Sequence, residues 1–194
     1  MNYSKALLVA WSVTLTCTVV AAAAQSALKA GVFEPPSSAP AFSLQASTGG
    51  EQALANYRGK VVLLGFGFTH CPQVCPTTLA VLSQARKRLG AQAEQLQILY
   101  VTVDPERDNP DQMRAYLRGF DPTFVGLTGA PDKVAAVHAK YGVTAERKPV
   151  GNSYAVAHSS SVYLIDRKGL LRAMMPYGRA PDDYVHDVRI LLNE

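Results

Sequence analysis

The sequence predicts an α/β domain in which helices flank a central mixed β-sheet, and three observations support this. Residues 61–68 and 96–103 are nearly uninterrupted apolar runs, typical of strands buried on both faces of a sheet. Between them, residues 77–89 carry apolar side chains at helical spacing and end with basic residues before a glycine. Residues 161–174 predict a hairpin that turns at 166–169. Strand, helix, strand and a final hairpin together favour a layered α/β architecture.

Shorter elements complete the predicted sheet and its covering helices. One expected helix has proline in its first turn, and the last has two acids at its positive end, which are favoured positions for both residue types. A glycine-containing turn joins the first two strands. In chain order, these elements are strands at 42–45 and 52–54, a helix at 111–120, a strand at 124–127 and helices at 131–141 and 181–192.

The first 24 residues differ from the rest of the chain. After Lys5, residues 6–24 carry no charge, which predicts either a cleaved signal peptide or an uncleaved membrane anchor. In both cases the following domain would be exported, and an uncleaved anchor would keep Lys5 on the cytoplasmic side. A lipid-modified Cys17 is a third option, although the residues before it fit a lipoprotein signal poorly. Residues 25–39 contain a proline pair and are expected to form a flexible linker.

Residues 40–194 are expected to form a single domain, because no repeat or second change in composition divides them. A domain of this length buries a sizeable core without a metal or disulfide. The chain has 19 Lys and Arg against 15 Asp and Glu, and its one basic cluster is 86–88, so we expect no nucleic-acid partner. With 48% hydrophobic and 18% charged residues, the composition excludes a disordered or collagen-like chain.

Cys71 and Cys75 carry the chemistry that the sequence predicts most directly. They lie where a buried strand ends and a helix begins, a usual place for a functional site in an α/β sheet. Because a helix N-terminus stabilises a thiolate, we expect a lowered pKa for one or both thiols. Residues four apart share one helix face, so the two sulfurs can bind one soft metal ion or close a disulfide. A purely structural disulfide over so short a loop would add little stability.

A neutral imidazole would complete a three-ligand copper site, and the chain has four histidines. His138 and His186 fall in expected helices and are expected to be surface or half-buried residues. His70 adjoins Cys71, and neighbouring residues of an extended segment point in opposite directions. His158 precedes the last hairpin and could lie at the rim of the sheet, facing the cysteines. The spacing alone leaves the role of His158 open.

Asp104 follows the predicted strand at 96–103 and has two interpretations. A carboxylate at the same rim of the sheet could orient a ligand histidine and raise its basicity. Equally, Asp104 could be a turn residue before proline that pairs with nearby Arg107. The residues themselves do not separate these two roles.

Several separated motifs together resemble the Sco/SenC family. They are FTHCPQVCPTTL at 68–79, VDPERD at 103–108, VGLTG at 125–129, YAVAH at 154–158 and VYLID at 162–166. The resemblance implies a thioredoxin-like fold of the peroxiredoxin type. It also implies copper, as Cu(I) or Cu(II), bound by Cys71, Cys75 and His158, with Asp104 as the supporting acid. Two positions depart from the family pattern, since Gln73 and Ala157 stand where family members commonly have aspartate.

The same resemblance implies a copper chaperone that helps to assemble the binuclear copper site of cytochrome c oxidase. Its partners would be the copper-site subunit of the oxidase and another periplasmic copper chaperone. The domain would face the periplasm and be associated with the inner membrane.

Two other functions remain open from the residues. One is a thiol–disulfide oxidoreductase that keeps partner cysteines reduced, although the spacing is C-x-x-x-C rather than the C-x-x-C of thioredoxins. The other is a redox or copper sensor. A peroxidase is disfavoured, because Pro72 stands where a peroxiredoxin-like site has threonine before Cys75. Whether the chain is an enzyme therefore depends on which use it makes of the cysteine pair.

Overall fold

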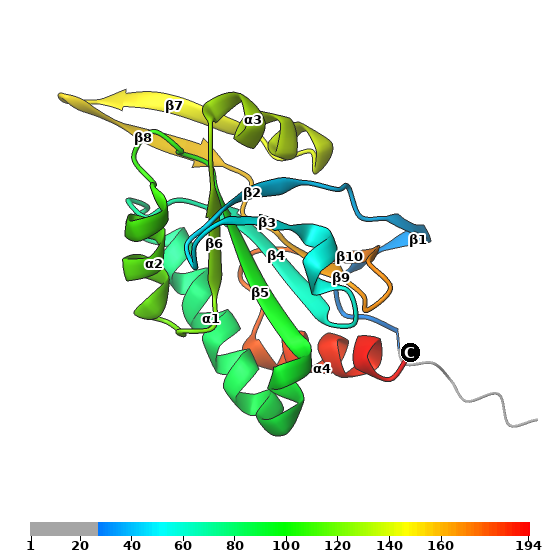
Figure 1. Cartoon of the computed structure of the whole chain (residues 1–194). Coiled ribbons are helices and arrows are strands. Elements are labelled where there is room, and N and C mark those ends of the chain that lie inside the picture. Colours follow the sequence, from blue (N-terminus) through cyan, green and yellow to red (C-terminus); the bar gives the residue numbers. More distant parts are fainter. Residues whose placement is uncertain (1–26) are drawn as a thin grey trace, which may run out of the picture.

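The computed structural model describes residues 27–194, and a sheet of eight strands lies at their centre (Figure 1). The strand order across the sheet is β1-β10-β9-β4-β5-β6-β2-β3. β4, β5 and β6 run parallel, whereas the other pairings are antiparallel, so the predicted mixed sheet is confirmed. The strands are β1 (Gly31–Ser38), β2 (Ser43–Ala46), β3 (Glu51–Ala53), β4 (Val61–Gly67), β5 (Leu96–Thr102), β6 (Val125–Thr128), β9 (Val162–Ile165) and β10 (Leu170–Met175).

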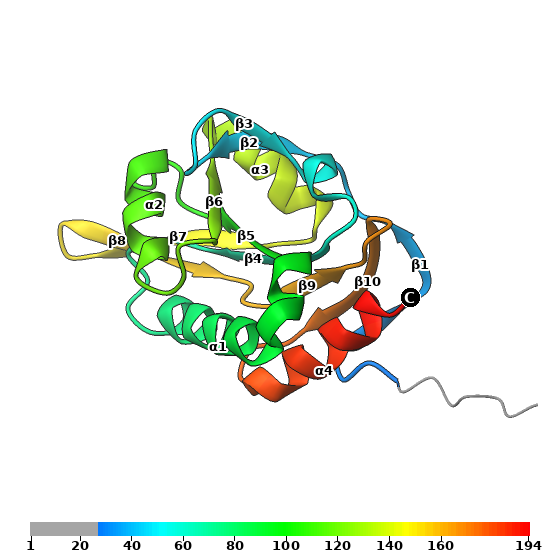
Figure 2. The same ribbon diagram turned by 60° about the horizontal axis from the view of Figure 1, so that its bottom comes forward.

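Helices cover both faces of this sheet, as the sequence predicts (Figures 1 and 2). On one face lie α1, α2 and α4, and on the other lies α3, under which Phe66 of β4 packs against His138 and Tyr141. The helices are α1 (Val74–Leu89), α2 (Pro110–Arg118), α3 (Pro131–Lys140) and α4 (Pro181–Leu192), with short 3-10 turns at η1 (Leu54–Tyr57) and η2 (Gly90–Gln95).

β4 occupies the middle of the sheet, and all seven of its residues are buried. It pairs in parallel with β5 on one side and antiparallel with β9 on the other. A strand covered on both faces and both edges meets no water, which explains its uninterrupted apolar sequence. The loop that carries the two cysteines follows this buried strand directly.

The segment 31–38 differs from the flexible linker predicted for 25–39. It forms β1, an edge strand that pairs with β10 at both of its ends. Pro35 and Pro36 lie between the two paired stretches, where their missing amide hydrogens cost no sheet hydrogen bonds. The linker prediction is therefore wrong for 31–38, because two prolines are compatible with an edge strand.

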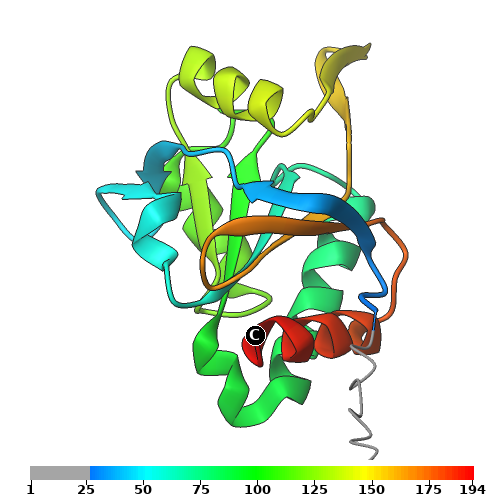
Figure 3. The same cartoon turned by 90° about the vertical axis from the view of Figure 1, so that its right-hand side faces the viewer.

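The chain that precedes β1 is also attached to the domain. The carboxylate of buried Asp187 in α4 accepts hydrogen bonds from the amides of Lys29 and Ala30 at 2.8 and 2.9 Å. Leu28 and Phe33 pack against the core. The sequence predicts that the folded domain starts at residue 40. These contacts show that it starts earlier in the chain (Figure 3).

A two-stranded hairpin, which the sequence analysis lacks, projects from the main sheet (Figure 1). It consists of β7 (Ala145–Val150) and β8 (Ser153–His158). Every residue of β7 is exposed, so its sequence shows none of the apolar alternation that marks a half-buried strand. β8 ends at His158 and brings that side chain back to the body of the domain.

Within residues 27–194, no helix has the length and apolar character needed to cross a membrane. The predicted signal peptide or anchor at 1–24, with Cys17, lies outside the described residues.

Candidate metal centre

Cys71, Cys75 and His158 come together beyond the carboxyl end of β4. Their potential ligand atoms, two Sγ atoms and one imidazole nitrogen, all lie within 4.8 Å of one another. Cys71 is in the loop after β4, Cys75 is in the first turn of α1, and His158 is the last residue of β8. The Sγ atom of Cys75 is 3.5 Å from Nε2 of His158. The fold thus joins a local pair of sulfurs to an imidazole 83 residues away.

The cysteine loop is shaped by the start of α1. The helix begins at Val74, three residues before the predicted start, so Cys75 belongs to its first turn. Gln73 precedes the helix but its side chain makes no capping hydrogen bond. Instead, the Sγ atom of Cys71 accepts a hydrogen bond from the amide of Cys75 at 3.4 Å. The sulfur of Cys71 therefore occupies the place of an N-cap acceptor at the positive end of the helix.

The structure corrects the expected lowering of the thiol pKa for Cys75. This side chain is only 1% exposed, and burial raises the pKa of its thiol to about 12. Burial outweighs the hydrogen bonds that stabilise the thiolate, because a buried charge loses its hydration. A metal ion supplies the positive charge that such a thiolate lacks. The buried sulfur is therefore better suited to metal binding than to reaction as a free thiolate.

His158 is held in the form that can bind a metal. Its Nδ1 atom is 2.7 Å from the carbonyl oxygen of Ser159, which can only accept, so Nδ1 carries the proton. Nε2 is left with its lone pair on the side of Cys75. Phe68 packs edge-on against the ring, with 5.8 Å between centroids. Burial also lowers the pKa of His158, which favours the neutral imidazole that metal binding needs.

Asp104 is buried beside the site and contacts residues other than His158. Its carboxylate accepts hydrogen bonds from Nε of Arg107 and from the hydroxyl of Tyr154, the latter at 2.9 Å. The Arg107 guanidinium lies 3.8 Å from the centre of the Tyr154 ring and donates to the Tyr154 carbonyl at 3.1 Å. The ion pair with Arg107 is thus present. Asp104 does not hydrogen-bond to His158, because Nδ1 of His158 donates to Ser159. Asp104 can therefore position His158 only indirectly, by holding Tyr154 of β8.

The other three histidines lie apart from the ligand group. His138 is buried and its Nε2 is 2.9 Å from the carbonyl oxygen of Thr102, so the expected surface or half-buried position is wrong. The reason is that α3 packs this side of the helix onto the sheet, against Phe66. His186 is half-buried and bonds to Asp187. The His70 side chain is 51% exposed.

Asp108 is a structural residue of the site that the sequence reasoning missed. Its fully buried carboxylate accepts hydrogen bonds from the amide and hydroxyl of Thr69, and from the hydroxyl of Thr102 at 2.7 Å. These contacts tie the start of the cysteine loop to the end of β5. The signal was available, because Asp108 is the last residue of the motif at 103–108.

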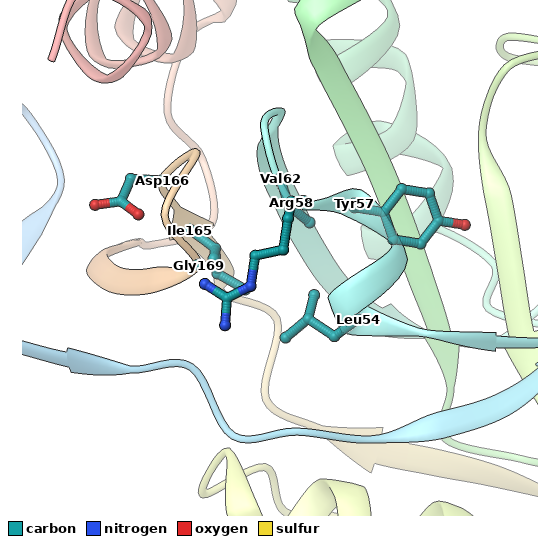
Figure 4. Close-up of a pocket in the computed structure, with 7 residues that line it drawn as sticks. All are labelled: Leu54, Tyr57, Arg58, Val62, Ile165, Asp166 and Gly169. Carbon is teal, nitrogen blue, oxygen red and sulfur yellow. The ribbon is translucent and has the colours of Figure 1, made fainter.

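A separate small pocket lies at the opposite end of β4 (Figure 4). Figure 4 shows that the carboxylate of Asp166 points away from the Arg58 guanidinium. That carboxylate is engaged by the amides of Lys168 and Leu170 and by Arg172. The carboxylate of this pocket is thus used by the turn at 166–170, and the pocket is remote from the cysteines. Its lining residues are Leu54, Tyr57, Arg58, Val62, Ile165, Asp166 and Gly169.

The donor set of the metal centre fits copper. Two thiolates and one imidazole are soft to borderline ligands, a set that suits Cu(I) and excludes Mg²⁺ or Ca²⁺. Structural zinc sites almost always have four protein ligands, whereas the group within residues 27–194 has three. The chemistry of the residues therefore favours copper over zinc.

The fold and the site define a thioredoxin-like domain with a potential Cys₂His metal centre at the carboxyl edge of its sheet. The family model described as SCO1/SenC matches residues 33–193, and the chain belongs to the Sco/SenC family.

Individual relatives agree with this assignment. The structure of Bradyrhizobium japonicum ScoI with copper bound is 34% identical with a TM-score of 0.75, and the match covers 80% of this chain and 100% of that one. The structure of BsSco, described as having a disulfide switch and belonging to the Sco family of cytochrome c oxidase assembly proteins, is 26% identical with a TM-score of 0.67. That match covers 82% and 95% of the two chains. The mitochondrial SCO2 homolog of Bos taurus is 38% identical over 152 residues, which are 76% of this chain and 57% of the relative.

Proposed function

We propose that this chain binds copper through Cys71, Cys75 and His158 and delivers it to the binuclear copper site of cytochrome c oxidase during assembly. The observation that carries the proposal is the convergence of two sulfurs and one imidazole nitrogen within 4.8 Å, from a loop, a helix and a hairpin. Copper bound in a solved ScoI structure and the oxidase-assembly role named for BsSco support it.

The unequal exposure of the ligands suggests how copper leaves the site. Cys75 is buried, whereas Cys71 and His158 are partly exposed. A partner's thiolate or imidazole would meet the copper first on the side of Cys71 and His158. Cys75 would release the metal last and regain its proton, since burial holds its pKa high. Copper transfer by this route exchanges ligands one at a time and needs no unfolding of the domain.

A copper titration of the full chain with reduced thiols tests the proposal. We expect one Cu(I) per chain, lost in Cys71→Ala and His158→Ala. His186→Ala is the matched control, because this histidine bonds to Asp187 in α4, away from the ligand group. A chain that binds no stoichiometric copper, or equal copper binding by the His158 and His186 variants, would contradict the proposal.

We also propose that the domain faces the periplasm next to the inner membrane. The uncharged residues 6–24 support export of the domain, and the implied partners are the oxidase's copper-site subunit and another periplasmic copper chaperone. Fractionation of cells that make the full chain, with N-terminal sequencing of the product, tests this location. Recovery of the whole chain in the cytosol would rule it out.

A second candidate function is a thiol–disulfide oxidoreductase. It is favoured by the partly exposed Cys71, whose sulfur lies within 4.8 Å of the Cys75 sulfur, while both cysteines are free. In this reaction the two thiols would reduce a partner's disulfide and themselves form one. Such chemistry does not need His158. Reductase activity that survives in His158→Ala, when copper binding is lost, would favour this function over copper delivery.

A further inference from the structure

Two glycines in the middle of the buried strand β4 need a physical explanation. Gly65 and Gly67 are two residues apart and so lie on the same face of β4. Glycine inside a strand weakens it, because it has no side chain to pack and loses more conformational freedom on folding. The ring of Tyr100 from β5 fills the space above them. A Cβ atom on Gly65 would lie 3.0 Å from Cδ2 of Tyr100, and one on Gly67 would lie 1.9 Å from its hydroxyl oxygen. The glycines thus make room for this tyrosine.

The Tyr100 ring ends at the metal centre. The same hypothetical Cβ on Gly67 would lie 2.7 Å from the Sγ atom of Cys75, so the hydroxyl and the sulfur meet above Gly67. The Tyr100 hydroxyl and this sulfur are therefore neighbours in the space that Gly67 leaves open. Tyr100 and Cys75 are each only 1% exposed, so water has little access to either group. A phenylalanine would fill the same space, which means that packing alone does not require the hydroxyl.

We propose that Tyr100 is a positioning residue of the metal centre, whose hydroxyl donates a hydrogen bond to the Cys75 sulfur when that sulfur is a copper-bound thiolate. This inference rests on the proposed copper binding at Cys71, Cys75 and His158. A hydrogen bond to a thiolate is stronger than one to a neutral thiol, because the acceptor is charged. The hydroxyl therefore stabilises the copper-bound form more than the copper-free form, and it draws electron density from the sulfur.

The substitution Tyr100→Phe in the full chain removes the hydroxyl and keeps the ring. We expect Cu(I) affinity, measured by competition with a chromogenic Cu(I) chelator, to fall roughly tenfold. In the Cu(II)-loaded protein, the sulfur-to-copper absorption band should move to longer wavelength, because the sulfur regains electron density. Tyr163→Phe is the matched control, since it removes a buried hydroxyl that donates to the carbonyl of Tyr141 on the opposite face of the sheet. It should change thermal stability without changing either copper signal.

The outcomes separate the inference from the proposed function. Absence of copper binding by the unsubstituted chain would overturn the proposed function. Copper binding by that chain, with unchanged affinity and spectrum in Tyr100→Phe, would overturn the role of Tyr100 alone. A second measurement needs no substitution: the ring resonances of Tyr100 in isotope-labelled chain should shift on Cu(I) loading more than those of Tyr163. Equal shifts would also overturn the inference.

Discussion

The two histidines His138 and His158 have similar surroundings but face different groups. Each packs edge-on against a phenylalanine at the carboxyl end of β4, Phe66 for His138 and Phe68 for His158. Each has one ring nitrogen within hydrogen-bond distance of a backbone carbonyl oxygen. Burial lowers the pKa of both. Neither burial nor a lowered pKa therefore distinguishes a metal ligand from a core histidine.

The difference lies in whether a ring nitrogen faces the cysteines. His138 is in α3 on the face of the sheet opposite α1, and its Nε2 donates to the carbonyl oxygen of Thr102. His158 is at the end of β8, where its Nε2 is 3.5 Å from the sulfur of Cys75. His158 is the ligand candidate because its Nδ1 donates to a carbonyl oxygen, which leaves the unprotonated Nε2 facing a sulfur.

The largest expected effect separates these histidines directly. We expect His158→Ala to lose more copper affinity than the roughly 10- to 100-fold typical of residues that only support a ligand. His138→Ala should keep its copper stoichiometry and lose about 2 kcal/mol of unfolding free energy, since it empties a buried site and frees the Thr102 carbonyl. Copper titration and denaturant unfolding of both variants measure this. Loss of copper from the His138 variant at full stability would break the comparison.

A smaller effect on copper binding, together with a loss of stability, is expected at the residues that attach β8 to the domain. Asp104→Asn should cost about 3 kcal/mol of unfolding free energy. It removes the buried negative charge that pairs with the Arg107 guanidinium and leaves that guanidinium without its partner. Glu106→Gln is the control, since it breaks an exposed pair with Arg147 and should cost less than about 1 kcal/mol. Unfolding in denaturant provides the values. An Asp104 variant of normal stability with weakened copper binding would instead indicate direct action on His158.

The smallest effect concerns pH. Because burial lowers the pKa of His138 below 6.5, the unfolded chain takes up a proton as the pH falls through 6.5 while the folded chain does not. His138 therefore reduces stability as the pH falls from 6.5 toward its folded pKa, by at most about 1.4 kcal/mol per pH unit. His138→Gln keeps a hydrogen-bond donor without this titration and should flatten the curve of unfolding free energy between pH 7 and 5. A variant with the same slope as the unsubstituted chain would contradict the prediction.

The central sheet and its helices could be predicted because their signals are local. The apolar run of β4 and the helical spacing in α1 need no knowledge of what packs against them. Two features, β1 and the β7–β8 hairpin, were missed for different reasons. β1 contains two prolines and pairs with distant β10, while β7 is exposed throughout.

The residues of the candidate site also fall into two groups, those that local sequence identifies and those that depend on how the chain packs. Cys71 and Cys75 could be identified from their spacing at a strand-to-helix junction. His158 could not be chosen among four histidines by spacing, and only the family resemblance pointed to it. The sequence predicts a lowered pKa for one or both thiols, whereas burial raises the pKa of Cys75, because helix position is a local property and burial is not.

By itself, then, the sequence determined the α/β class, the pair of cysteines and the family. Each of these conclusions rests on patterns among residues that are close together in the chain. Only the tertiary structure decided that His158 meets the sulfurs, that Asp104 pairs with Arg107 and Tyr154, and that a tyrosine hydroxyl from β5 lies against Cys75. These contacts join residues on separate elements. Their existence depends on strand register and on how helices and hairpins pack, which local sequence patterns do not specify.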